Sequence, residues 1–193
     1  SGFLGIPLMK LWGGLEAMNL ILIYDQVQGM FMFTLGIMVI TGGFSKKSFL
    51  SMLHSPILWS VALGFLFRLT PLSMPQSLVN TFTFAGEAAS PLAAFALGVS
   101  IRTIQYTFSW NLIGALLLRF VGGYLIGYVA VLAFGLTGLA RTVVLVSTAL
   151  PSAMFTSILP LRYGLPNQFA STMVLTSTLL GVLTIPLSFA LAG

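Results

Sequence analysis

Six long apolar stretches, each with at most one charged side chain, make up most of the chain. A helix needs about 20 apolar residues to cross the hydrocarbon core of a bilayer. A membrane β-barrel would instead show segments of about ten residues that alternate between apolar and polar side chains. The pattern therefore predicts an all-α integral membrane protein, a polytopic helix bundle. The stretches cover residues 18–42, 57–72, 77–101, 110–134, 140–161 and 169–192.

Composition and charge exclude a soluble domain. Charged residues make up 6% of the chain and hydrophobic residues 58%, whereas a soluble domain has about 25% charged residues. The few cations lie mostly in loops, where they indicate membrane topology rather than a nucleic-acid surface. The chain has no Cys, and its one His is in a loop, so we expect no metal site. It also lacks a Gly-rich phosphate loop, and we predict neither an enzyme nor a cofactor.

Two Gly- and Pro-containing segments interrupt the apolar pattern. An unsatisfied backbone N–H or C=O costs several kcal/mol in a bilayer, so a helix break is tolerated only against protein or a water-filled cavity. Paired breaks in corresponding positions of two halves indicate the binding site of a transporter. The two segments are Gly2-Phe3-Leu4-Gly5-Ile6-Pro7 near the beginning and Leu150-Pro151-Ser152-Ala153 near the end.

The spacing after the two prolines is similar. A glycine inside an apolar stretch follows 29 residues after Pro7, at Gly36, and 30 residues after Pro151, at Gly181. Alternation of the loops places the two breaks in spans of opposite direction. This is the arrangement expected of an inverted-topology repeat.

Hydroxyl side chains follow the second break. The N-terminus of the half-helix that begins there favours an anionic group, and Ser152 and Thr156 lie beside it. The alternative is a structural kink whose freed backbone groups bond to these hydroxyls. The predicted substrate-binding residues are Gly5, Pro7, Pro151, Ser152, Ala153 and Thr156.

Four polar residues are candidates for ion coupling or for lining a cavity: Glu87, Asp25, Gln26 and Gln28. Glu87 lies about ten residues from either end of its stretch, where a charge costs at least ~2.5–3.5 kcal/mol. It is either a proton, cation or substrate site, or a protonated side chain at a packing seam of small residues. Asp25 is predicted near a helix start, where the helix dipole stabilises an anion. A capping or interface position therefore competes with a cavity position for Asp25.

Lys and Arg residues predict the orientation. One face of the predicted bundle carries five Lys and Arg residues and the other face carries three. The positive-inside rule makes the face with five cations cytoplasmic and leaves the carboxyl end outside. This count assumes that the Arg119 side chain snorkels to its near interface. One face collects Lys46, Lys47, Arg102, Arg119 and Arg162, and the other collects Lys10, Arg68 and Arg141.

Five segments, taken in order, resemble segments of the auxin efflux carrier family of permeases. This PIN-like family is related to the bile-acid/sodium symporters. The resemblance runs along nearly the whole chain, and the order of the segments is more specific than any one of them. They are the segment from Ser1 to Leu8, Tyr24-Asp25-Gln26-Val27-Gln28-Gly29, the run from Pro91 to Ile101, Leu150-Pro151-Ser152-Ala153 with Arg162-Tyr163-Gly164, and Leu183-Thr184-Ile185-Pro186-Leu187.

The resemblance implies ten helices in two inverted repeats of five. Two scaffold helices per repeat support a transport domain whose broken helices cross at mid-membrane. On this mapping, residues 1–42 end the first repeat, residues 43–56 form a cytoplasmic loop, and residues 57–193 are the second repeat. Because Ser1 lies inside a predicted helix, we expect an N-terminally truncated permease.

These observations predict a secondary transporter of the elevator type for a small organic anion, either a dicarboxylate or an auxin-like carboxylate. The expected partners are the lipid bilayer, H+ or Na+ as coupling ion, and a second copy of the chain in a homodimer. The expected location is a bacterial inner membrane or a plasma membrane. The alternatives are a membrane sensor that does not transport, an inactive truncated fragment, and a channel.

Overall fold

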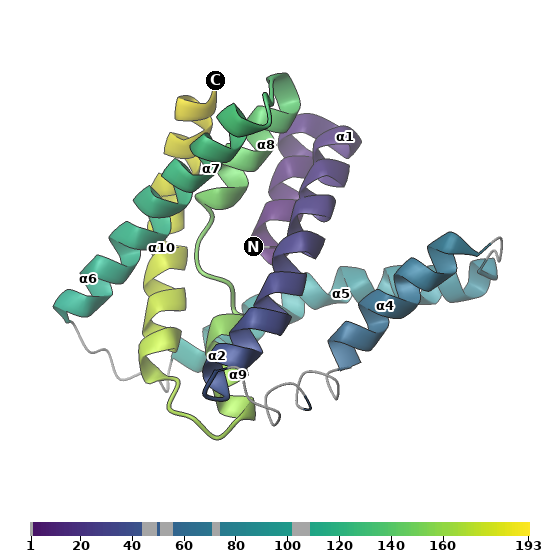
Figure 1. Cartoon of the computed structure of the whole chain (residues 1–193), viewed down its shortest axis with the longest axis horizontal. Coiled ribbons are helices and arrows are strands. Elements are labelled where there is room, and N and C mark those ends of the chain that lie inside the picture. The colour runs from purple at the N-terminus through teal and green to yellow at the C-terminus, as the bar shows by residue number, and fades with distance from the viewer. Residues whose placement is uncertain (1, 44–49, 51–55, 71–73, 102–108) are drawn as a thin grey trace. The chain divides into compact units, whose positions relative to one another are not determined.

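The computed structural model describes residues 2–43, 50, 56–70, 74–101 and 109–193 (Figure 1). All the elements in this part of the chain are helical, which confirms the predicted all-α bundle. Two π-helical turns lie within longer helices: η1 (Met32–Gly36) joins α1 to α2, and η2 (Leu118–Gly122) joins α6 to α7. The α-helices are α1 (Gly2–Phe31), α2 (Ile37–Ile40), α4 (Pro56–Leu69), α5 (Gln76–Ile101), α6 (Trp110–Leu117), α7 (Gly123–Ala133), α8 (Gly138–Thr148), α9 (Phe155–Arg162) and α10 (Gln168–Ala192).

Helices of membrane-spanning length occur where the apolar stretches predicted them. Trp110–Ala133 and Gln168–Ala192 are long and apolar enough to cross a bilayer, as is the range Gly2–Ile40, which includes a kink at Gly13 and Gly14. α4 and α5 coincide closely with the second and third stretches. α8 and α9 lie on either side of Pro151, so the fifth stretch is a broken span.

The chain divides into two compact units. The first contains Ser1–Asp25 and Leu92–Gly193, and the second contains Gln26–Pro91. The division into repeats at residues 1–42 and 57–193 stays a prediction. Almost all of the predicted loop 43–56 lies outside the described residues, as do the loop cations Lys46, Lys47 and Arg102 and the side chains of Arg68 and Arg162.

Helix α1 folds back on itself at two glycines. Gly13 (φ −124°, ψ 17°) and Gly14 (φ 68°, ψ −155°) leave helical geometry, and the positive φ of Gly14 favours glycine. The first arm, residues 2–12, and the second arm, residues 15–31, run antiparallel (Figure 1). At 1.5 Å per residue the first arm is about 16 Å long, about half of a ~30 Å hydrocarbon core. The first arm alone is therefore too short to cross the hydrocarbon core.

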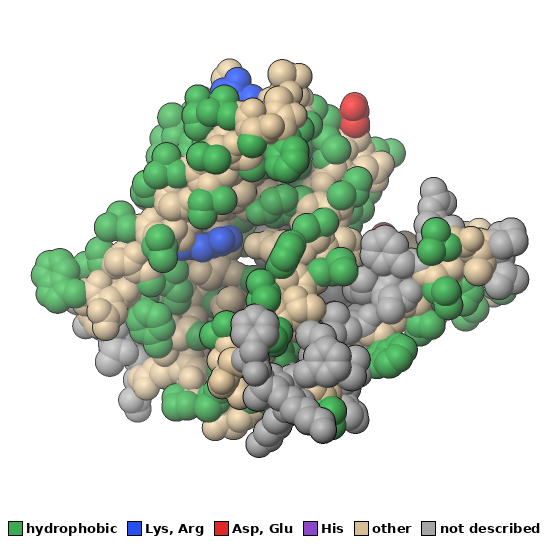
Figure 2. All heavy atoms as spheres, in the orientation of Figure 1, with side chains coloured by type: hydrophobic (Ala, Val, Ile, Leu, Met, Phe, Trp, Pro, Cys, Tyr) green, Lys and Arg blue, Asp and Glu red, His purple; other side chains and the backbone are tan. Residues whose placement is uncertain are grey.

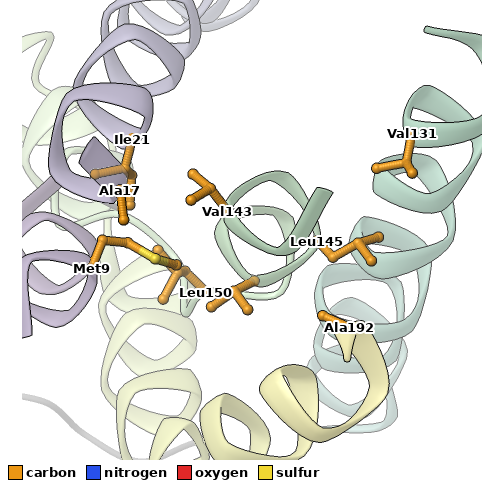
Figure 3. Packing of buried hydrophobic residues seen from close by; sticks show 9 residues of the cluster. Met9, Ala17, Ile21, Val131, Val143, Leu145, Leu150 and Ala192 are labelled. Atoms are coloured by element: carbon orange, nitrogen blue, oxygen red, sulfur yellow. The ribbon is translucent and has the colours of Figure 1, made fainter. Parts of the chain in front are cut away.

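The apolar core of the first unit is centred on α8. Its Val143 points toward Ile21 of α1, and its Leu145 points toward Val131 of α7 and Ala192 of α10 (Figure 3). All five side chains are at most 4% exposed. Since α8 packs against α7 and α10 as well as the α1 hairpin, its carboxyl end is held inside the protein.

Apolar side chains also cover the outside of the helices. Leu118, Ile126 and Val129 are more than 60% exposed on the α6–α7 helix. Figure 2 shows green side chains spread over this face, with charged side chains at its upper end and blue atoms again part-way down. An apolar outer surface of this extent is what a lipid-facing helix requires.

The α7–α8 packing requires a glycine. A Cβ atom on Gly123 would lie 2.5 Å from the Thr148 carbonyl oxygen, which belongs to the backbone. The two helices therefore meet at main-chain contact at the end of α8. A side chain at this position would push the end of α8 away from α7.

We predict that Gly123→Ala lowers the apparent melting temperature in detergent, because the added methyl overpacks a backbone contact at a cost of about 1–3 kcal/mol. Gly114→Ala is the matched control, since it lies on the same long helix and a Cβ there meets nothing within 4 Å. It should be neutral or slightly stabilising. Equal melting temperatures for the two variants would contradict the close α7–α8 contact.

Candidate functional site at the helix break

The chain leaves helical geometry between α8 and α9, inside the core. α8 ends at Thr148 and α9 begins at Phe155. Pro151 has no N–H to donate, and it disfavours helical geometry at the residue before it. Because α8 is about 16 Å long, the break lies near the middle of a ~30 Å hydrocarbon core. Pro151 is buried, and Ser152 and Ala153 are half-buried.

Helix α10 satisfies a backbone donor of the break. The backbone N–H of Ser152 donates to Oγ of Ser177 over 3.1 Å, and that hydroxyl donates to the Val174 carbonyl over 3.0 Å. Ser177 is fully buried. Gly181, one turn further along α10, allows close approach, because a Cβ there would lie 2.8 Å from Cγ of Pro151. α10 thus provides both the space and a hydrogen-bond partner for the break.

Polar side chains also fix the half-helix that follows the break. Oγ of Ser157 and Oγ of Ser171 lie 2.5 Å apart. Nδ2 of Asn167 donates to Oγ of Ser171 over 3.1 Å and to the Ser157 carbonyl over 3.3 Å. Thr156 is exposed, and its hydroxyl donates to the Ala153 carbonyl over 2.6 Å. These bonds hold α9 against α10 and orient its N-terminus.

The first arm of α1 meets the break from the other side. Gly5 is buried, and a Cβ there would lie 2.8 Å from Cδ1 of Leu150. The rings of Phe3 and Phe155 are stacked, with centroids 6.3 Å apart and planes inclined by 29°. The structure therefore brings the predicted residue Gly5 together with the segment around Pro151.

The prediction that residues 2–7 interrupt a helix is wrong. α1 begins at Gly2 and continues helically through Pro7, which is exposed. A proline in the second turn removes only one hydrogen bond of this helix, the one to the Phe3 carbonyl. Of the two residues predicted from this segment, Gly5 contacts the break and Pro7 lies on the outside of the arm.

Arg119 is the charged side chain at the break, and the prediction that it snorkels to the interface is wrong. Its Nη2 donates to the Pro151 carbonyl over 3.2 Å, and its Nε is buried without a partner in the described part of the chain. Arg119 lies in the π-helical turn η2, a feature that often marks functional positions. It follows nine residues after Trp110, roughly 14 Å along the helix, so it is deep in the membrane.

Tyr24 of the second arm interacts electrostatically with the Arg119 cation, and Asp25 interacts with Tyr24. Asp25 is ten residues beyond the beginning of the second arm, not near a helix start as predicted. The Asp25 carboxylate lies instead beside the N-terminus of the first arm. A Cβ on Gly2 would lie 2.6 Å from Oδ2 of Asp25. The partial positive charge of that N-terminus favours an anion there.

The other predicted cavity residues belong to the second unit. Gln26 is exposed and Gln28 is half-buried, both near the end of α1. Glu87 is exposed on α5. Their contribution to a cavity or to ion coupling stays a prediction.

Arg119 and Ser177 are the residues at the break that the sequence analysis missed. A single charge inside an apolar stretch is functional by default, and this signal was available for Arg119 in the stretch 110–134. Ser177 offered no such signal, because serine in an apolar helix commonly bonds to its own helix.

A family model and two relatives match this chain, and all three are described as membrane transport proteins or transporters. A family model described as "Membrane transport protein" matches residues 40–189. An uncharacterized transporter of Methanothermobacter thermautotrophicus is 28% identical over 193 residues, which cover 97% of this chain and 63% of the relative. An uncharacterized transporter of Methanocaldococcus jannaschii is 26% identical over 116 residues, 59% of this chain and 37% of the relative. The chain thus spans under two thirds of the length of either relative, and no solved structure matches it.

We predict that Ser177→Ala destabilises the protein by about 1–3 kcal/mol, because it leaves the Ser152 N–H unsatisfied in an apolar interior. Ser188→Ala is the matched control: Ser188 is also buried on α10, and its hydroxyl donates to the Ile185 carbonyl of its own turn. Thermal unfolding in detergent measures both variants. A melting temperature of Ser177→Ala no lower than that of Ser188→Ala would contradict the role of this bond.

Proposed function

The chain belongs to the Membrane transport protein family, and on that premise we propose that it is a secondary transporter for a small organic anion, with its substrate site at the Pro151 break. The family assignment agrees with the motif resemblance to the auxin efflux carriers. It makes the chain part of an integral membrane transporter. The substrate, its coupling and the mechanism are the proposed parts.

The observation that carries this proposal is a polar break enclosed by an apolar bundle. A membrane protein keeps an irregular backbone at this depth only where the backbone lines protein or a cavity. Here four elements meet at the break: the first arm of α1, the α6–α7 helix at Arg119, α8 and α10. A kink that served only packing would not need a cation that donates to its Pro151 carbonyl.

The charges at the break favour an anionic substrate. The helix dipole adds a partial positive charge at the N-terminus of α9, although the N–H groups of Thr156, Ser157 and Ile158 already donate to the Ala153 and Met154 carbonyls. The Arg119 guanidinium adds a full positive charge beside Pro151. Anions are attracted to such a site, and cations are repelled from it.

The two compact units support an elevator mechanism. The break and the elements around it all belong to the first unit, while α4 and most of α5 belong to the second. In this mechanism the elements around the break carry the substrate across the membrane, and α4 and the part of α5 up to Pro91 act as scaffold. Glu87 of the scaffold and Asp25 of the first unit are the candidate proton carriers.

The proposed orientation has its carboxyl end outside the cell. With Arg119 turned inward, the predicted count of cations on the two faces falls from five against three to four against three. The positive-inside rule still favours the same face as cytoplasmic.

We predict that Ser152→Leu and Thr156→Leu abolish transport without reducing expression, because a bulky apolar side chain fills the break and removes polar groups. The measurement is uptake of radiolabelled malate and indole-3-acetate into proteoliposomes. Thr83→Leu is the control: its hydroxyl bonds to its own helix at the Val79 carbonyl, and it lies in the other unit. It should transport at the wild-type rate.

Three outcomes of this assay separate the functional classes. Saturable flux that Ser152→Leu abolishes supports the transporter. Binding of either probe without flux indicates a sensor, and flux that does not saturate indicates a channel. Wild-type flux in both Ser152→Leu and Thr156→Leu would place the substrate site elsewhere.

A further inference from the structure

We propose that Arg119 binds the carboxylate of the substrate through the edge of its guanidinium that carries Nε and Nη2. This inference rests on the proposed function and deepens it, because it names the chemical group that the site recognises. The group is a planar carboxylate with two oxygens, and an uncharged analogue of the same shape is rejected.

The first step is the set of hydrogen bonds that Arg119 makes. A guanidinium has five N–H donors in a fixed plane. The one hydrogen bond of Arg119 within the described residues runs from Nη2 to the Pro151 carbonyl over 3.2 Å. Nε is buried and has no partner in this part of the chain. The guanidinium therefore has unused donors at the break.

The second step is the charge. The Arg119 side chain is half-buried, and a guanidinium that loses part of its hydration is costly unless an anion compensates it. In the ranges that the structure describes, Arg119 forms no ion pair: its hydrogen-bond partner is a neutral carbonyl, and its electrostatic neighbour is the Tyr24 phenol. Among the described residues no carboxylate pairs with Arg119, and the carboxylate of an anionic substrate would supply the compensating charge.

The third step is geometry. Carboxylates and guanidinium groups pair through two parallel N–H···O bonds, and Arg is preferred over Lys where such pairing is needed. Nε and Nη2 lie on one edge of the guanidinium, and Nη2 already points to the break. A carboxylate that bound this edge would lie beside Pro151 and Ser152.

A purely structural role for Arg119 makes a different prediction. If its function were only to hold the Pro151 carbonyl, Lys would preserve it, because an ammonium keeps the charge and can donate to one carbonyl. Lys cannot provide two parallel donors in one plane. Arg119→Lys therefore separates carboxylate binding from support of the backbone.

The experiment measures equilibrium binding to the purified protein in detergent. The probes are radiolabelled indole-3-acetate, benzoate and malate, with indole-3-acetamide as the uncharged analogue. The variants are Arg119→Lys, Arg119→Gln and the control Arg141→Gln, which removes a cation in the first turn of α8, roughly 10 Å along that helix from its end. Thermal unfolding of every variant shows whether the bundle is intact.

We expect the wild-type protein to bind at least one carboxylate and not the amide. Arg119→Lys and Arg119→Gln should weaken that binding about 10- to 100-fold, the loss expected for a charged hydrogen-bonded pair. Arg119→Lys should keep the wild-type melting temperature, and Arg141→Gln should keep wild-type binding. If Arg119→Gln does not fold, Arg119→Lys alone decides the result.

Three results would overturn the inference: unchanged affinity in Arg119→Lys, equal binding of indole-3-acetate and its amide, or no binding of any of the three carboxylates. Flux in proteoliposomes separates this inference from the proposed function. Carboxylate binding that depends on Arg119 but gives no flux would leave the inference standing and refute transport. Saturable flux that is unchanged in Arg119→Lys would refute the inference and leave transport standing.

Discussion

An interrupted helix inside a bilayer must find hydrogen-bond partners for its freed backbone groups, and the first unit is organised around this constraint. At that depth the partners must come from protein or from a water-filled cavity. Ser177 of α10 accepts from the Ser152 N–H, and Arg119 of the α6–α7 helix donates to the Pro151 carbonyl. Two helices that are distant in sequence are thereby tied to the same two residues of the break. Stability and the proposed binding role therefore depend on the same contacts.

Small residues allow the surrounding elements to come close enough for these bonds. Gly181 admits the ring of Pro151, Gly5 admits the side chain of Leu150, and Gly123 brings α7 against the end of α8. Each would be overpacked by a methyl group. Close packing of this kind is typical of membrane helices, because apolar side chains gain little from leaving lipid. The break is thus enclosed without large side chains that would fill it.

The spans and the Pro151 break could be predicted from the sequence, because apolar length and a mid-stretch proline act locally. Pro7 was misjudged, since near the beginning of a helix a proline removes little and the helix continues through it. The helix start beside Asp25 comes from the other arm of the α1 hairpin, a tertiary contact that no local pattern encodes. The direction of the Arg119 side chain was missed for a similar reason. It depends on the π-helical turn and on the position of Pro151, 32 residues away.

The most direct test of a substrate site at the break is chemical access to Ser152, and the absence of Cys makes the chain suitable for it. Ser152→Cys would be reacted with the anionic reagent 2-sulfonatoethyl methanethiosulfonate in proteoliposomes, beside Ser188→Cys, a buried position on α10. If the break lines an anion-accessible cavity, the Ser152→Cys thiol reacts at least about tenfold faster, and a bound carboxylate slows it. Equal rates at the two positions, or no protection by malate or indole-3-acetate, would contradict a substrate site at Pro151.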